Sequence, residues 1–175
     1  VYTEFPTMNL RKFWMSSPEF LDIQKEAKSW ESIGAWASGG VNVSATSEPF
    51  RVTSARSTRS LLDTLGVQPV LGRGFVPEEE KPNGPNSALI AHSLWQRAFG
   101  GQTDIVGKQI RINAQPFTII GVMPQAYAFP PGTNDPADRR SRVVMHFAPP
   151  EQQGYLQIVP APWNTRRVVL LVLGR

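Results

Sequence analysis

Turn-forming residues recur along the whole chain and limit what it can build. Sixteen of the 175 residues are proline and fourteen are glycine. Proline interrupts the hydrogen bonding of helices and sheets, and glycine favours tight turns, so long uninterrupted elements have little room. We therefore predict many short helices and strands, which argues against a helical bundle or a coiled coil.

The chain nevertheless has enough apolar material for a core. Hydrophobic residues make up 41% and charged residues 18%, which excludes a disordered tail. There is no cysteine, so a disulfide scaffold, a thiol nucleophile and a cysteine-based zinc site are excluded. The longest apolar run, Val168–Leu173, is far shorter than the ~20 residues of a membrane helix. Because the chain starts at Val1 without an initiator methionine and stops after a strand-like run, we expect a soluble piece of a longer protein.

Positive charge is concentrated in the last part of the chain. The net charge is +4; residues 104–175 hold eight basic and four acidic residues, whereas residues 1–103 hold ten of each. Arg139, Arg140 and Arg142 form a basic cluster, and we take them as the candidate partner surface for phosphate, an anionic membrane surface or an acidic partner. A solvated loop is the alternative. The cluster lacks interleaved aromatic residues, so we expect no nucleic-acid partner.

Capping residues predict the helices. Ser16 and Glu19 have the spacing of a capping box, with Pro18 suited to a first turn, so an amphipathic helix is expected to run to Trp30. Thr58 is predicted to cap a short helix through Leu65 that Gly66 ends. Ser93 is predicted to open another helix that Gly100 closes.

Alternating and β-branched runs predict the strands. They are expected over residues 1–5, 33–37, 41–44, 50–56, 88–91, 108–112, 115–122 and 167–173. Ile110 and Ile112 should share one face of a hairpin. Its two-residue loop prefers glycine where Ala114 stands, so we expect a looser or different turn there. Residues 124–163 contain eight prolines and are expected to form a long irregular excursion. The β-branched and leucine run Arg167–Leu173 is typical of a strand buried on both faces.

Residues capable of chemistry do not form a recognisable set. The three adjacent carboxylates Glu78–Glu80 lie on a polar loop and favour a solvated turn over a cation site. His92 and His146 favour packing or capping roles. Asn134, Asp135 and Asp138 could offer oxygens to calcium, but they lack the ligand spacing of a calcium loop. We therefore predict no catalytic, cofactor-binding or metal-binding residues and no cofactor, and expect the domain to act by contact and movement.

Five segments in a fixed order carry a family resemblance. They are Ser17–Ile23, Trp30–Trp36, Leu65–Phe75, Ser93–Gly101 and Ile105–Pro124. Together they resemble the MacB-like periplasmic core domain of ABC-transporter permeases, above all the large group of predicted bacterial permeases in which this domain is often duplicated.

The resemblance implies an α+β fold outside the membrane, with a βαβ-type lobe and an inserted mixed α/β lobe. We assign residues 1–38 plus 164–175 to the first lobe and 39–163 to the second. The first lobe can be incomplete, because family members usually carry a further helix after the last strand.

The resemblance also implies a non-catalytic role in transport or efflux, on the periplasmic side of the cell inner membrane. Such a domain relays the motion of its own transmembrane helices, which a cytoplasmic ATPase subunit drives. It also contacts a periplasmic adaptor protein or substrate. No active-site residue is carried over from the family.

Two other functions stay open. A stand-alone extracytoplasmic module that binds a ligand or peptide would need a deep pocket with converging polar groups. A hydrolase would need a nucleophile and a base within hydrogen-bond reach. Trp14, Trp95 and Trp163 are the alternative partner-surface residues if they are exposed, but core positions suit them better.

Overall fold

The structure is a computed structural model of the chain. It describes residues 3–5, 10–13, 17–26, 32–45, 48–81, 83–127, 142–146 and 169–171. The helices are α1 (Ser17–Glu26), α2 (Leu61–Leu65) and α3 (His92–Phe99), with 3₁₀ turns η2 (Pro77–Glu80) and η3 (Thr103–Ile105). The strands are β1 (Thr3–Phe5), β2 (Leu10–Phe13), β3 (Gly34–Ser44), β4 (Phe50–Ser57), β5 (Leu71–Gly72), β6 (Ser87–Ile90), β7 (Gln109–Ile112), β8 (Gln115–Val122), β9 (Arg142–His146) and β10 (Val169–Leu171). In the part of the chain just listed, no helix has the length and apolar character needed to cross a membrane.

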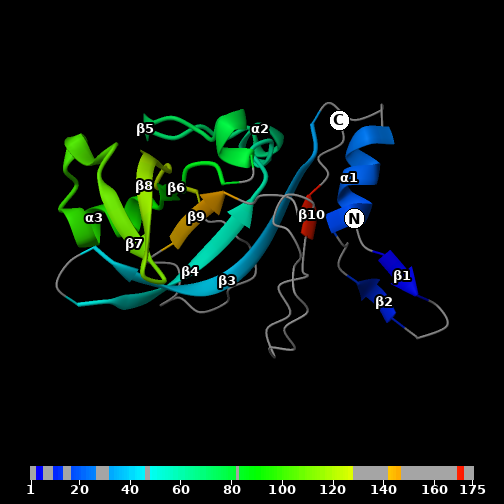
Figure 1. Cartoon of the computed structure of the whole chain (residues 1–175), viewed down its shortest axis with the longest axis horizontal. Helices are drawn as coiled ribbons and strands as arrows, with labels where there is room; N and C mark the ends of the chain where they lie inside the picture. Colours follow the sequence, from blue (N-terminus) through cyan, green and yellow to red (C-terminus); the bar gives the residue numbers. More distant parts are fainter. Residues whose placement is uncertain are drawn as a thin grey trace.

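Strand pairing closes the main sheet into a ring (Figure 1). The ring runs β3, β4, β9, β6, β8, β7 and back to β3. Its closing seam is short, because β7 meets β3 only through the pairs Val43–Ile112 and Ser44–Arg111. The pairs β4–β9 and β6–β8 are parallel and the remaining pairs are antiparallel. The mixed sheet and its helices form the α+β fold that the sequence predicted.

The inner face of the ring holds the main core. Strand alternation turns one set of apolar side chains inward, and α3 and η3 add Leu94 and Ile105 to the same cluster. Ile110 and Ile112 are buried in this cluster while Gln109 and Arg111 are exposed, so the predicted shared face is confirmed. The buried members are Val41, Val43, Val52, Ala88, Ile90, Leu94, Ile105, Ile110, Ile112, Ile119 and Val122.

The described residues cover only part of the outer face of the ring. Two smaller clusters, one with Leu62, Leu89 and Ile120 and one with Trp36, Ala55 and Leu61, pack α2 against it. We call this part, with α2 and the segment from residue 66 to 81, the covered half. The outward positions of β3, β4 and β7 away from α2 form the open half, where Gly40, Asn42, Arg51, Gln109 and Arg111 are exposed.

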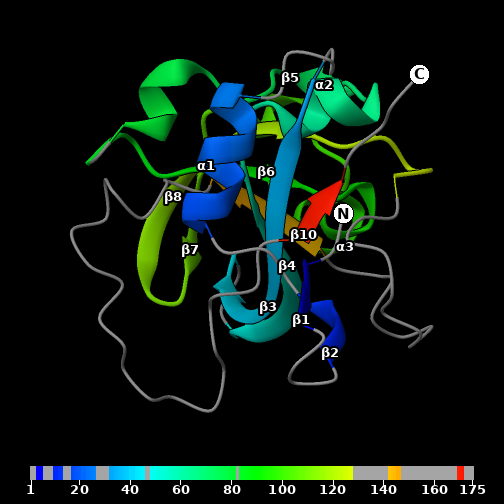
Figure 2. The same ribbon diagram turned by 90° about the vertical axis from the view of Figure 1, so that its right-hand side faces the viewer.

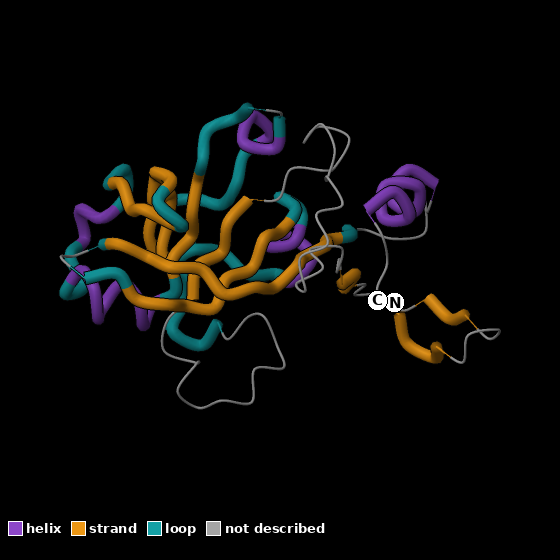
Figure 3. Tube along the Cα trace, turned by 60° about the horizontal axis from the view of Figure 1, so that its bottom comes forward, coloured by secondary structure: helices purple, strands orange, loops and turns teal. Residues whose placement is uncertain are grey.

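The elements from the two ends of the sequence gather at one end of the molecule (Figures 1 and 2). β1 and β2 form a separate antiparallel pair, and β10 pairs with the first residues of β3 through Leu171–Gly34, Leu170–Ala35 and Val169–Trp36. From this end β3 extends to the far side of the ring (Figure 3). It crosses the predicted lobe boundary between residues 38 and 39 without interruption. The two-lobe division stays a prediction.

Several local predictions were wrong for identifiable reasons. The two strands expected around Gly39-Gly40 are one strand, β3, because β4 pairs with it along its length. The stretch expected to be irregular contains β9, whose Val143–Met145 bridge β4 and β6 in the middle of the sheet. The turn at Asn113-Ala114 is a tight two-residue loop with φ of 49° and 68°. Pairing of β7 with β8 outweighs the preference for glycine there.

The helix ends were predicted better at the C-terminus than at the N-terminus. Gly66 and Gly100 both adopt the left-handed conformation expected of C-caps. α3 begins at His92, after the extended residue Ala91, and Ser93 does not cap it. Thr58 does not cap α2, because its hydroxyl is engaged with β3. Ser16 and residues 27–30 of the first predicted helix lie outside the described residues, as do 167–168 and 172–173 of the last predicted strand.

Candidate functional site

The predicted partner surface is placed only in part. Arg139 and Arg140 lie outside the described residues. Arg142 is the first residue of β9, in register with Thr53 of β4. Trp95 is half-buried and donates a hydrogen bond from its indole Nε1 to the carbonyl of Gln102 at 2.8 Å, a core-edge role; Trp14 and Trp163 lie outside the described residues.

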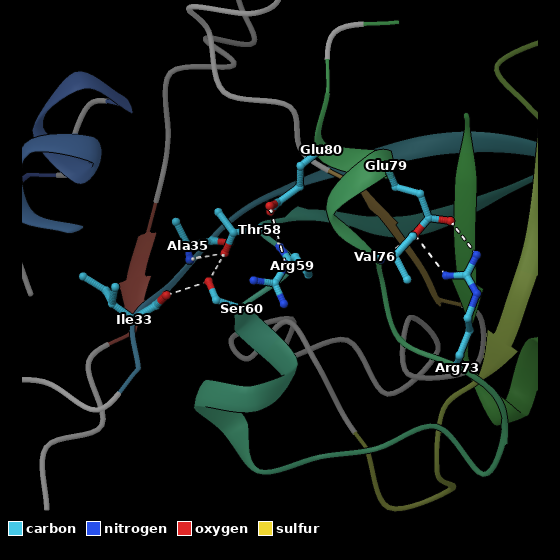
Figure 4. Close-up of polar contacts among 9 residues, drawn as sticks. All are labelled: Ile33, Ala35, Thr58, Arg59, Ser60, Arg73, Val76, Glu79 and Glu80. Carbon is cyan, nitrogen blue, oxygen red and sulfur yellow. Dashed lines mark hydrogen bonds and ion pairs between the residues drawn. The ribbon is translucent and has the colours of Figure 1, made fainter. Parts of the chain in front are cut away.

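A buried carboxylate organises the covered half. Glu79 is only 2% exposed, yet the sequence placed it on a solvated turn, and that prediction was wrong. Its oxygens accept two hydrogen bonds from the Arg73 guanidinium (2.9 and 3.1 Å), one from the Val76 amide (2.8 Å) and one from the Ser87 hydroxyl. Figure 4 shows the bidentate pair with Arg73. The carboxylate thereby joins η2 to β6 and to Arg73, the residue that follows β5.

The environment of Glu79 favours its charged form. Burial raises the pKa of this carboxyl, but the hydrogen bonds from Arg73, Ser87 and Val76 outweigh burial, so the net pKa is lowered. The hydrogen bonds with Glu79 raise the pKa of Arg73 in turn. Both groups are therefore charged at neutral pH, and the pair is a fixed ionic link.

The sequence contains a signal for Glu79 that was overlooked. Pro77 opens η2, and Glu79 occupies the third position after Val76, where a carboxylate side chain can bond back to the backbone at a helix start. Three consecutive glutamates concealed which of them faces inward.

A second polar cluster locks the start of β3 to the end of β4; we call it the polar junction (Figure 4). The Thr58 hydroxyl accepts a hydrogen bond from the Ala35 amide (3.0 Å), and the Ser60 hydroxyl donates to the Ile33 carbonyl (2.6 Å). The Thr58 amide donates to the Ala35 carbonyl (2.9 Å). Gly34 lies among these contacts with an ideal Cβ position only 2.6 Å from the Leu61 Cα, so the backbones touch directly.

The polar junction is also tied to η2. The Arg59 amide donates to Glu80 Oε1 at 2.7 Å, and the Arg59 guanidinium lies 3.8 Å from Glu80 Oε2. The Ser32 and Thr64 hydroxyls share a hydrogen bond of 2.7 Å. The polar junction and the Glu79 cluster thus hold η2 through two neighbouring residues, Glu80 and Glu79.

The apolar pocket beside α2 does not gather polar groups. It has a volume of about 480 Å³ and is open to solvent. Its lining is mainly apolar, and Gln68 contributes its one amide side chain; the lining residues are Leu65, Gly66, Val67, Gln68, Pro124, Ala126 and Tyr127. It lacks the converging polar groups that a dedicated ligand site would need.

Other predicted candidates have structural partners or lie outside the description. His92 packs edge-on against Trp95, with ring centroids 5.2 Å apart. His146 ends β9, in register with Ser57. Asn134, Asp135 and Asp138 lie outside the described residues. Within the described residues, no three acidic, histidine or cysteine side chains gather as metal ligands would.

Two solved structures share this fold. The periplasmic region of MacB from Actinobacillus actinomycetemcomitans matches with a TM-score of 0.65 and 12% identity, over 99% of this chain and 72% of that one. The extracellular domain of the noncanonic ABC-type transporter YknZ from Gram-positive bacteria matches with a TM-score of 0.58 and 17% identity, over 77% and 63%. The fold is thus the one found in extracytoplasmic domains of ABC-type transporters.

The sequence itself gives the family. The chain matches the MacB-like periplasmic core domain over residues 4–169, and it belongs to that family. A stretch of 80 residues is 29% identical to the pyoverdine export ATP-binding/permease protein PvdT of Pseudomonas syringae pv. syringae (strain B728a). That stretch is 46% of this chain and 12% of PvdT, so the chain corresponds to a small part of its relative. The protein is a periplasmic domain of a MacB-like ABC-type transporter permease, as the resemblance implied.

Proposed function

We propose that this domain relays the motion of the permease's transmembrane helices to the periplasm, without catalysing a reaction itself. The observation that carries the proposal is β3. This strand starts beside β10, among the elements from the two ends of the sequence, and ends at the seam with β7. Its 11 residues span about 36 Å in an extended strand.

Rigidity at the start of β3 supports this role. A relay needs an element that moves as a body, and packed hydrogen-bonded structure transmits displacement better than loops do. The polar junction fixes the first residues of β3 to Thr58 and Ser60, and the Gly34–Leu61 contact leaves no gap between β3 and α2. A displacement applied near β10 would therefore move α2 and the ring together.

The partners follow from the same proposal. The transmembrane helices would lie in the cell inner membrane, a cytoplasmic ATPase subunit would drive them, and a periplasmic adaptor protein or the substrate would receive the motion. The name of PvdT, an export ATP-binding/permease protein, supports an ATP-driven export system.

The proposal can be tested by following the domain through an ATP cycle. The sequence has no cysteine, so Asp63→Cys and Asp104→Cys place labels at two exposed positions without background from this domain. In the full-length permease reconstituted with its ATPase, quenching of the Asp104 label by a headgroup quencher reports its height above the membrane. We expect this quenching to change between nucleotide-free and ATP-bound states. When the same two cysteines carry spin labels instead, the distance between the labels should stay constant.

Weakening the polar junction should weaken the relay. T58V/S60A removes two hydroxyls that hold β3, and we expect a smaller ATP-dependent change in quenching at Asp104. Thr103→Val, at an exposed residue, is the matched control. If ATP is hydrolysed at the normal rate while the Asp104 label keeps one height, the relay proposal is wrong.

A further inference from the structure

The open half carries arginines on an exposed strand surface. Register pairing places Arg111 opposite Ser44 and Arg51 opposite Asn42, and directly paired residues share a face of a sheet. Thr53 lies two residues after Arg51, and β9 puts Arg142 in register with it. The positions of Arg51, Arg111 and Arg142 therefore belong to one face, across four neighbouring strands.

Arg51 and Arg111 have no acidic partner among the described residues. The ion pairs of the described residues join Arg59 to Glu80, Arg73 to Glu79 and Lys108 to Asp104. Neither Arg51 nor Arg111 forms an ion pair with another described residue, and Glu48, on the connection between β3 and β4, does not either. The face thus presents positive charge that the described structure does not neutralise.

The sheet itself leaves room for one guanidinium to lie flat. An ideal Cβ on Gly40 would lie 2.6 Å from an Arg51 terminal nitrogen and 2.9 Å from its Cζ. A side chain at residue 40 would therefore displace the Arg51 guanidinium. The glycine holds this planar donor against the strand, beside the exposed side chain of Asn42.

The chemistry of the face fits a polypeptide better than a lipid surface. Guanidinium groups recognise carboxylates through paired hydrogen bonds, and Asn42 and Ser44 add neutral donors and acceptors between them. A membrane-binding surface would add large apolar side chains for insertion. The exposed large apolar residues of the described chain, Val70 and Val106, follow α2 and η3 and do not belong to the open half.

We propose that the open half is a docking surface for an acidic polypeptide segment, held by Arg51 and Arg111 with Arg142 at the adjoining position. This inference rests on the proposed function for its partner, because a periplasmic adaptor is the polypeptide that would present such a segment.

The test measures binding of a fluorescent polyglutamate peptide to the full-length permease in phosphatidylcholine nanodiscs. We expect R51E/R111E to weaken binding at least about tenfold, a loss of ~1.4 kcal/mol. The matched control R56E/K81E makes the same change in net charge at exposed residues off this face and should change the affinity by less than about twofold. Rising salt should weaken the wild-type complex.

Two further variants separate geometry from charge. R51K/R111K keeps the charge and loses the planar fork, so binding should fall between wild type and R51E/R111E. Gly40→Ala should weaken binding by displacing the Arg51 guanidinium with no change in charge.

Equal losses of peptide affinity in R51E/R111E and R56E/K81E, or no loss in either, would overturn the inference. So would binding of phosphatidylglycerol vesicles that depends on Arg51 and Arg111 while polyglutamate does not bind. None of these measurements uses ATP, so the result is independent of the relay test.

Discussion

The two halves of the outer face use arginine in opposite ways. In the covered half, Arg73 grips the buried Glu79 through two hydrogen bonds, and the pair joins three elements. In the open half, Arg51 and Arg111 are exposed on strands and make no ion pair with a described residue. Arg73 stabilises the fold because the chain supplies it with a buried carboxylate. Arg51 and Arg111 have no acidic partner among the described residues, so their charge is available to another molecule.

Substitution of Gly72 in the covered half should destabilise the protein more than any other change considered for it. Its φ is +77°, and a Cβ there would lie 2.1 Å from the Ile120 carbonyl oxygen. Gly72→Ala should lower the free energy of unfolding by about 3 kcal/mol or more, measured by urea denaturation. Gly66→Ala is the matched control, because Gly66 has a similar φ of +64° but no neighbour within 4 Å; it should cost ~1 kcal/mol. Equal losses in the two variants would show that backbone strain at positive φ, and not the tight β5–β8 contact, causes the loss of stability at Gly72.

The next largest effect is at Glu79. Glu79→Gln keeps the shape but loses the charge that Arg73, Ser87 and Val76 bind, so we expect a loss of about 2 kcal/mol in the free energy of unfolding at pH 7. The neighbouring Glu78→Gln, at an exposed residue, should have almost no effect.

The effect of Glu79 should depend on pH in one direction. The folded state lowers its pKa, so its stabilising contribution is complete above the ordinary glutamate pKa of about 4.3 and is lost as the pH falls through the folded pKa. The stability difference between wild type and Glu79→Gln should therefore shrink as the pH is lowered below about 5. A difference that stays constant down to acid-induced unfolding would contradict the ionic role.

A small gain in stability is expected at the loop between β7 and β8, beside the open half. Ala114 has a φ of 68°, which an alanine adopts at a cost and a glycine adopts freely. Ala114→Gly should raise the free energy of unfolding by up to about 1 kcal/mol. The same substitution at Ala126, which has no positive φ, is the control and should bring no gain.

The smallest effect sharpens the contrast between the halves. R51Q/R111Q removes two exposed charges that pair with no described acid, so the free energy of unfolding should change by less than about 0.5 kcal/mol. A loss comparable with that of Glu79→Gln would mean that Arg51 and Arg111 stabilise the fold as Arg73 does.

The sequence predicts those elements whose ends and pairing depend on residues close together in the chain. Gly66 and Gly100 mark helix ends because left-handed caps need no distant partner, and the hairpin of β7 and β8 follows from alternation. β9 was missed because a strand of five residues gains its stability from β4 and β6, which lie far away in the chain. Glu79 was missed because its burial depends on Arg73 and Ser87 converging across three elements.

The docking surface that we propose shares one residue with the surface predicted from the sequence. Charge bias pointed to arginines in the last part of the chain, and of these Arg142 lies beside the open half, in register with Thr53. The role of either surface in partner binding stays a prediction. Arg51 and Arg111 were not selected, because each stands alone in its own segment. Only strand register brings them onto one face.

The place of β9 in the sheet has a consequence for biogenesis. Among the described strands β9 is the one that pairs with both β4 and β6, and it follows all of the other ring strands in the sequence. A chain emerging N-terminus first on the far side of the membrane thus exposes two unsatisfied strand edges until residue 146 has been delivered. Such edges readily pair with other chains. The nascent domain should therefore depend on a holding chaperone during translocation, and truncation before β9 should yield aggregates instead of a smaller folded product.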